Sequence, residues 1–218
     1  MRARLWTGCF LLLVLSMGLV TVACINFDAQ ARSVASRATA SLSSPQLLDH
    51  IPEEWIDVLI QVEDPSFYDH PGVDLRTPGQ GWTTITQGIV KRYFGGSLAG
   101  VWGKSRQSLL ALALNRHLTK KQQLQVFLES AYFGSYNGRE LVGFEDASAT
   151  LYGKSLLRLT RSEYIGLVAM LVGPNRYNPL ERPSDHGERV ARIEALLAGR
   201  CGHLSRRDVY LEDCEVHE

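Results

Sequence analysis

The run of 21 residues from Leu5 to Ile25 contains no charged side chain, and Arg2 and Arg4 precede it. A helix of this length, at about 1.5 Å per residue, spans roughly 30 Å, which is the hydrocarbon thickness of a bilayer. Basic residues before such a segment place the short N-terminus in the cytoplasm and the rest of the chain outside. Residues 1–25 are therefore predicted to be an uncleaved membrane anchor.

Two other interpretations of this segment are open. It could be a signal peptide cleaved after Ala29-Gln30-Ala31, although the apolar run is long for a signal peptide. It could also be a lipoprotein signal ending at Cys24, although Thr21 stands where a Leu is expected. All three interpretations export the remaining chain.

The rest of the 218-residue chain has the composition of one globular domain, with 45% apolar and 21% charged residues overall. The formal net charge is zero and no long basic stripe is present, so a nucleic-acid partner is not expected. Residues 26–44 are rich in Ala, Ser and Arg and are predicted to be a linker. The predicted domain covers residues 45–198, and residues 199–218 form a tail.

Hydrophobic spacing predicts a mostly α domain, in which no segment alternates like a strand. Long loops are expected at 63–82, 95–104 and 134–143, where Gly and Pro interrupt the pattern. The 105–133 segment should break near Leu118, and Thr119 with Gln122 resembles a helix start with a capping box. The predicted helices are 45–62, 83–93, 105–133 with its break, 147–152, 162–172 and 188–198.

The tail holds Cys201 and Cys214, which an oxidising exterior would allow to form a disulfide. His203 and His217 lie nearby, but the spacing fits no standard zinc module. Bridged or free thiols are expected, and no metal site is predicted.

The most informative stretch for function is 63–74, which reads EDPSFYDHPGVD. It follows the apolar run from Trp55 to Val62, so Glu63 stands at the edge of hydrophobic packing. Partial desolvation disfavours a charged carboxylate and can raise its pKa into the range of a working acid or base. An isolated Glu at a helix end is more often an ordinary surface carboxylate, so this pattern alone does not settle its role.

A second stretch, 81–91, reads GWTTITQGIVK. Three hydroxyls and an amide at a helix start, followed by Lys91, make a polar helix end that favours anions. The simpler interpretation is an N-capped helix with a solvated lysine.

These stretches resemble the first two motifs of the family-51 glycosyltransferases, the peptidoglycan polymerases. Residues 63–74 match E-D-x-x-F-x-x-H-x-G-x-D at all six specified positions, and 81–91 resembles G-G-S-T-I-T-Q-Q-x-x-K with Trp82 for a Gly and Gly88 for a Gln. The resemblance implies that Glu63 is the catalytic base. It implies substrate-binding roles for Asp64, His70, Thr83, Thr84, Thr86, Gln87 and Lys91, although His70 by itself reads as a hydrogen-bonded loop residue.

The third family motif, R-K-x-x-E, falls on residues 103–107. Lys104 is retained, Gly103 replaces the Arg, and Gln107 replaces the second catalytic carboxylate. Arg106 is a neighbouring cation that could take the place of the missing one. A Gln can hydrogen-bond to substrate but cannot carry charge or transfer a proton as Glu can.

Further segments, 120–134, 143–154 and 159–179, resemble the family in order, so the resemblance covers about residues 45–198. It implies a mostly α, lysozyme-like domain with a membrane-embedded edge, in the monofunctional form without a transpeptidase domain. The implied location is the inner membrane, single-pass, with the domain on the periplasmic side.

The expected function is a glycosyltransferase that polymerises lipid II into glycan strands and releases undecaprenyl diphosphate. Its partners would be lipid II, the nascent glycan, the cytoplasmic membrane and other cell-wall synthesis proteins. No cofactor is required, although Mg²⁺ or Mn²⁺ could assist at the diphosphate. The alternatives are a pseudoenzyme that binds precursor or glycan and regulates wall synthesis, motivated by Gln107, Gly103 and Asn115, and a lytic enzyme of lysozyme-like fold.

Overall fold

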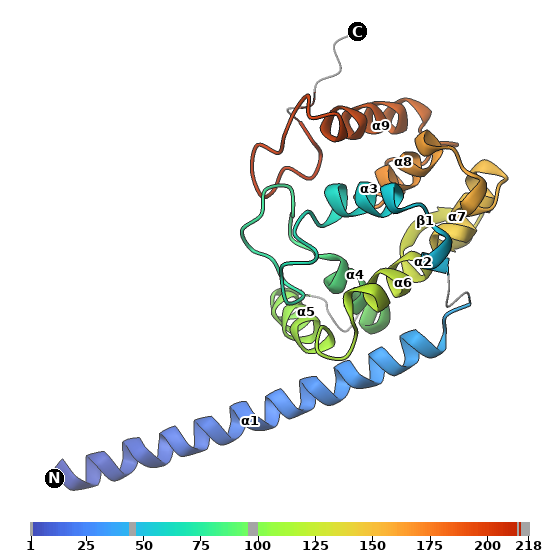
Figure 1. The fold of residues 1–218 in the computed structure, drawn as a ribbon. Coiled ribbons are helices and arrows are strands. Elements are labelled where there is room, and N and C mark those ends of the chain that lie inside the picture. The colour runs from blue at the N-terminus through green and yellow to red at the C-terminus, as the bar shows by residue number, and fades with distance from the viewer. Residues whose placement is uncertain (1, 44–46, 96–99, 213, 215–218) are drawn as a thin grey trace.

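The computed structural model describes residues 2–43, 47–95, 100–212 and 214 (Figure 1). A long N-terminal helix, α1 (Arg2–Ala40), runs past one side of a helical domain, and its N-terminal part extends well beyond that domain. Within α1, Leu13–Ala40 is long and apolar enough to cross a membrane. The prediction of an N-terminal membrane helix is therefore supported by length and composition.

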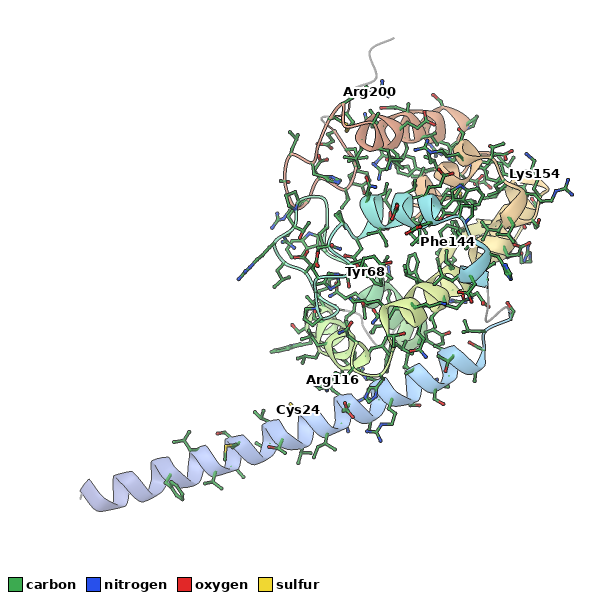
Figure 2. The ribbon with its side chains drawn as sticks, in the orientation of Figure 1. Cys24, Tyr68, Arg116, Phe144, Lys154 and Arg200 are labelled. Carbon is green, nitrogen blue, oxygen red and sulfur yellow. A yellow bond between two sulfur atoms is a disulfide. The ribbon has the colours of Figure 1, made fainter. Side chains whose placement is uncertain are left out.

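Residues 26–40 differ from the predicted linker, because they continue α1 and pack on the domain. Ala31, Val34, Ala35 and Ala38 recur at helical spacing and are buried. The small side chains allow α1 to lie close along α5 (Gly100–Leu114). Asp28 of α1 adds ion pairs with Arg116 and His117, and Figure 2 shows Arg116 on the side of the domain that faces α1. Sequence composition alone did not reveal this packing, because Ala and Ser are also common in linkers.

The first segment of the domain contains two helices where one was predicted. α2 (Leu47–His50) is separated from α3 (Glu53–Glu63) by Pro52, which cannot continue a helix. The apolar face of α3 is buried, as Trp55, Leu59 and Val62 predict. Glu63 is the last residue of this helix, so it stands where the buried face ends.

The middle of the domain consists of α4 (Ile85–Phe94), α5 and α6 (Lys120–Ser130). Thr119 caps α6 through the predicted capping box with Gln122. The expected loop at 100–104 belongs instead to α5, which begins at Gly100.

A short antiparallel hairpin replaces the loop expected at 134–143. Strand β1 (Tyr132–Tyr136) pairs with β2 (Arg139–Val142). Asn137 and Gly138 connect them with φ values of 52° and 77°, which is the backbone of a tight two-residue hairpin turn. The Asn-Gly pair was the available signal, but the strands are too short and irregular for alternation to be visible.

The C-terminal part of the domain consists of α7 (Phe144–Tyr152), the short 3-10 helix η2 (Leu156–Arg158), α8 (Arg161–Met170) and α9 (Pro183–Leu197). α8 is buried along most of its length and packs on both α3 and α9. Its Tyr164 ring stacks on Trp55, with ring centroids 4.5 Å apart, and lies 5.8 Å from Phe144. This aromatic cluster holds α3, and with it Glu63, in a fixed position. The described residues thus form the mostly α domain that was predicted.

Candidate active site

A cleft of ≈ 630 Å³ lies where α3 ends, α4 begins, α6 meets β1, and the C-terminal tail returns. Figure 1 shows the tail beside the loop that joins α3 to α4, and Figure 2 adds the side chains of this region. The residues that matter for chemistry on its wall are Glu63, Thr83 and Lys91. Side chains from both predicted motifs therefore line one cavity.

Glu63 has the electrostatics of a proton acceptor. Desolvation by the surrounding protein, helped by the adjacent Asp64 charge and opposed by Arg189, raises the pKa of Glu63 to about 7. A carboxyl group with such a pKa exchanges a proton readily near neutral pH. The position of Glu63 at the end of a buried helix face supplies the physical cause that the sequence suggested.

Asp64 is fully buried and holds the site together rather than lining it. One carboxylate oxygen accepts the backbone N–H of Ile85 at 2.9 Å, and the other lies 2.8 Å from His70 Nε2. Gly72 N–H donates to His70 Nδ1 at 2.9 Å, so Nε2 carries the proton and donates to Asp64. Asp64 and His70 thus connect the end of α3, the following loop and the start of α4.

Most of the second motif is also structural. Thr84 caps α4 through a capping box with Gln87, and its hydroxyl donates to Gly72 O at 2.7 Å. Thr86 donates to Gln123 Oε1 at 2.6 Å, and Gln87 donates to Ser108 Oγ at 2.9 Å. The side chains predicted to bind substrate at 84, 86 and 87 are buried in this network, and Thr83 alone of the predicted threonines is exposed beside the cleft.

Lys91 on the cleft wall and Lys104 beside Thr83 bring positive charge to this end of the cleft. Lys91 is exposed on the cleft wall, and Lys104 donates to Thr83 Oγ1 at 3.0 Å and to Gln107 Oε1 at 3.2 Å. Desolvation and, secondarily, the charge of Lys91 lower the pKa of Lys104. Within the described ranges neither lysine has a carboxylate at ion-pair distance, so both are available to an anion.

Two predicted site residues lie elsewhere. Gln107 is buried and its amide donates to Gln87 O at 2.8 Å, which places it behind Lys104 rather than on the cleft wall. Arg106 lies on the side facing α1, where Nη2 donates to Gln30 Oε1 at 2.8 Å and the guanidinium packs over the Phe94 ring. Gln107 therefore contacts Lys104, and Arg106 contacts α1.

Sequence reasoning missed Arg189 of α9, which is buried and acts electrostatically on Glu63. Its Nε and Nη1 atoms have no hydrogen-bond partner in the part of the chain that the structure describes. It also missed the tail residues Arg207, Val209 and Tyr210 on the cleft wall. The only sequence feature identified in this tail that could have indicated a folded segment is the pair Cys201 and Cys214, which form a disulfide in the structure. The bridge takes up both thiols, and His217 lies outside the described residues.

Comparison with known families matches residues 31–198 to the family described as transglycosylase. Penicillin-binding protein 1B of Escherichia coli is 30% identical over 159 residues, covering 67% of this chain and 19% of that protein. Penicillin-binding protein 1A of Pseudomonas aeruginosa is 32% identical over 152 residues, covering 64% and 18%, and penicillin-binding protein 2a of Streptococcus pneumoniae is 31% identical over 172 residues, covering 75% and 23%. The chain thus spans about a fifth of the length of these relatives. The match includes the cleft from Glu63 to Lys91, and the chain belongs to the transglycosylase family, the family-51 glycosyltransferases that its motifs resemble.

Proposed function

We propose that the protein is a peptidoglycan glycosyltransferase that polymerises lipid II. The observation that carries this proposal is a cleft lined by Glu63, with a pKa raised to about 7, and by Lys91 and Thr83, with Lys104 hydrogen-bonded to Thr83. A base and an anion site in one cavity are the two requirements for joining sugars while a diphosphate departs.

In the proposed reaction, the Glu63 carboxylate accepts the proton of the 4-hydroxyl of the acceptor sugar. The hydroxyl oxygen forms a bond to the anomeric carbon of the growing chain. The bond from that carbon to the diphosphate oxygen breaks, and its electron pair leaves with undecaprenyl diphosphate. Lys91 and Lys104 stabilise the negative charge that develops on this leaving group.

Gln107 is proposed as a positioning residue for Lys104, because its carbonyl oxygen accepts from Nζ while its amide is anchored to Gln87 O. No proton transfer is assigned to it. No cofactor is required in this proposal, although Mg²⁺ or Mn²⁺ could assist at the diphosphate of the substrate.

The proposed location is the inner membrane, with the domain on the periplasmic side, where the protein would meet lipid II, nascent glycan and other wall-synthesis proteins. The apolar helix Leu13–Ala40 supports membrane attachment. The Cys201–Cys214 disulfide supports an oxidising compartment for the domain.

The test uses the full chain in detergent with labelled lipid II, and Glu63→Gln as the matched isosteric variant. The expected result is polymer from the parent and none from the variant. Lipid II binding without polymer from either protein would identify a regulatory binding protein instead. Release of short fragments from preformed wall would identify a lytic enzyme.

A further inference from the structure

The tail after α9 folds into a closed loop that returns to the cleft. A disulfide joins Cys201 to Cys214, with their Cα atoms 5.3 Å apart. Inside the loop, the buried Asp208 carboxylate accepts the backbone N–H groups of Leu204 and Glu212, each at 3.0 Å. These internal bonds link the two ends of the loop and its middle to one another. The family match ends at residue 198, so this loop lies outside it.

Backbone hydrogen bonds attach the loop to the segment between α3 and α4. Gly79 N–H donates to Ser205 O at 3.0 Å, and Gly81 N–H donates to Arg206 O at 2.6 Å. Arg206 returns a bond from Nη1 to Gly81 O at 3.0 Å. The loop is therefore bound to the segment that leads directly into the second motif.

The two glycines are required for this contact. Both have positive φ, at 78° for Gly79 and 65° for Gly81. A Cβ on Gly79 would lie 2.3 Å from the His203 ring, and one on Gly81 would lie 2.6 Å from Val209 Cγ1. The loop and the segment that receives it are complementary in shape.

Trp82 fixes the side chains at the cleft edge. The Arg206 and Arg207 guanidinium carbons lie 4.3 Å and 4.8 Å from its ring centroid. Arg206 donates a hydrogen bond to Gly81 O, whereas Arg207 is exposed and lines the cleft together with Tyr210. Across the described ranges, Arg207 has no carboxylate at ion-pair distance.

We propose that Arg207 is a substrate-binding residue whose guanidinium binds an oxyanion of the sugar substrate, and that the loop closed by the Cys201–Cys214 disulfide positions it. This inference rests on the proposed function. A planar guanidinium stacked on an aromatic ring keeps its N–H edge free for a phosphate or carboxylate. Holding it in place also reduces the conformational entropy lost on binding. Trp82 stands where the family motif has Gly, so the stack belongs to this chain.

The test compares Arg207→Gln with Arg200→Gln in steady-state polymerisation of labelled lipid II. Arg200 is an exposed arginine of the same tail and lies on the far side of the domain from α1 (Figure 2). Arg207→Gln should raise KM about five- to twenty-fold, because a charge-assisted contact is lost, and leave kcat within about two-fold. Arg200→Gln should change neither constant by more than about two-fold.

A substrate comparison distinguishes the two sources of the oxyanion. The measurement is repeated with lipid II whose stem-peptide carboxylates are amidated. If the parent and Arg207→Gln then have the same KM, the group bound by Arg207 is a stem-peptide carboxylate. If the difference in KM persists, the group bound by Arg207 is the diphosphate. A second variant, Trp82→Leu, should raise KM in the same direction, and combining it with Arg207→Gln should add little, because both remove one positioned contact. Full additivity would overturn the role of the stack.

Binding measurements separate this inference from the proposed function. Lipid II affinity in detergent would be compared between Glu63→Gln and the double variant Glu63→Gln/Arg207→Gln, so that no turnover is needed. If the parent forms no polymer but the Arg207 change weakens binding at least about five-fold, the proposed function fails and the inference stands. If the parent polymerises lipid II and Arg207→Gln leaves KM and affinity unchanged, the inference is overturned alone.

Discussion

The Asp64 carboxylate accepts the backbone N–H of Ile85 at 2.9 Å, and this bond joins the helix that ends in Glu63 to the helix that carries Lys91. Asp64 is fully buried, so water does not compete for the bond. Asp64, which does not itself line the cleft, thus fixes the helix of the proposed base relative to the helix of Lys91.

Asp64→Asn should therefore reduce both stability and polymerisation. An Asn oxygen can still accept from Ile85, but its NH₂ group then faces His70 Nε2, and flipping the His tautomer would set Nδ1–H against the Gly72 N–H. The mismatch is expected to destabilise the fold by about 1–3 kcal/mol, measured by denaturant unfolding. An exposed neighbour, Asp69→Asn, serves as the control. Equal stability of Asp64→Asn and the parent would contradict this interpretation.

The raised pKa of Glu63 has a consequence for stability. The folded state holds the Glu63 proton more tightly than the unfolded chain, so the contribution of this residue falls as pH rises from about 4.5 through about 7. A rise in pKa of this size corresponds to roughly 3 kcal/mol above pH 7. Glu63→Gln should accordingly be more stable than the parent at pH 8 and equal to it at pH 4, as measured by thermal unfolding. A variant less stable than the parent at pH 8 would contradict the desolvation argument.

The positive charge of Arg189 lowers the pKa of Glu63, against the effect of desolvation. Removing that charge should therefore raise the Glu63 pKa further. Arg189→Met keeps an unbranched apolar side chain in this buried position, and Arg189→Lys keeps the charge. The acid limb of the polymerisation rate against pH should move upward for the Met variant and stay near the parent value for the Lys variant. A downward shift for Met would show that Arg189 does not act on Glu63.

Gln107→Glu tests whether the missing family carboxylate limits this protein. Glutamate cannot donate to Gln87 O, so the change places two acceptors together inside the protein, even though Lys104 could pair with the new charge. We expect a lower melting temperature and no gain in polymerisation rate. Ser105→Glu, which adds the same charge at an exposed position of α5, is the control. A clear rise in rate for Gln107→Glu would restore the catalytic role that the motif alignment suggested for position 107.

The fold was predictable where the sequence repeats at helical spacing or carries a local capping signal. Thr119 with Gln122 gave the start of α6, and the apolar face of α3 gave the burial that surrounds Glu63. The sequence predicts only a loop around Asn137, because strands of four and five residues are too short to show an alternating pattern.

The candidate site was predictable only in part, because motif positions do not reveal which side chains face a ligand. The cleft is lined by Glu63, Thr83 and Lys91. In contrast, the side chains of Thr86 and Gln87 form hydrogen bonds inside the protein. Arg189 and Arg207 come from sequence far downstream, and their placement depends on how α9 and the tail fold back. Tertiary packing of this kind has no local sequence signal.

The pH dependence of polymerisation tests the central claim most directly. Initial rates of glycan formation from labelled lipid II would be measured from pH 5 to pH 9 for the parent and for Glu63→Gln. The parent rate should rise about ten-fold per pH unit in the acid range and level off near pH 7, where Glu63 loses its proton, while Glu63→Gln stays inactive throughout. A parent rate that is already nearly level from pH 5 to pH 7, as an ordinary glutamate pKa of 4.5 would give, or polymer from Glu63→Gln at the parent rate, would contradict the assignment of Glu63 as the base.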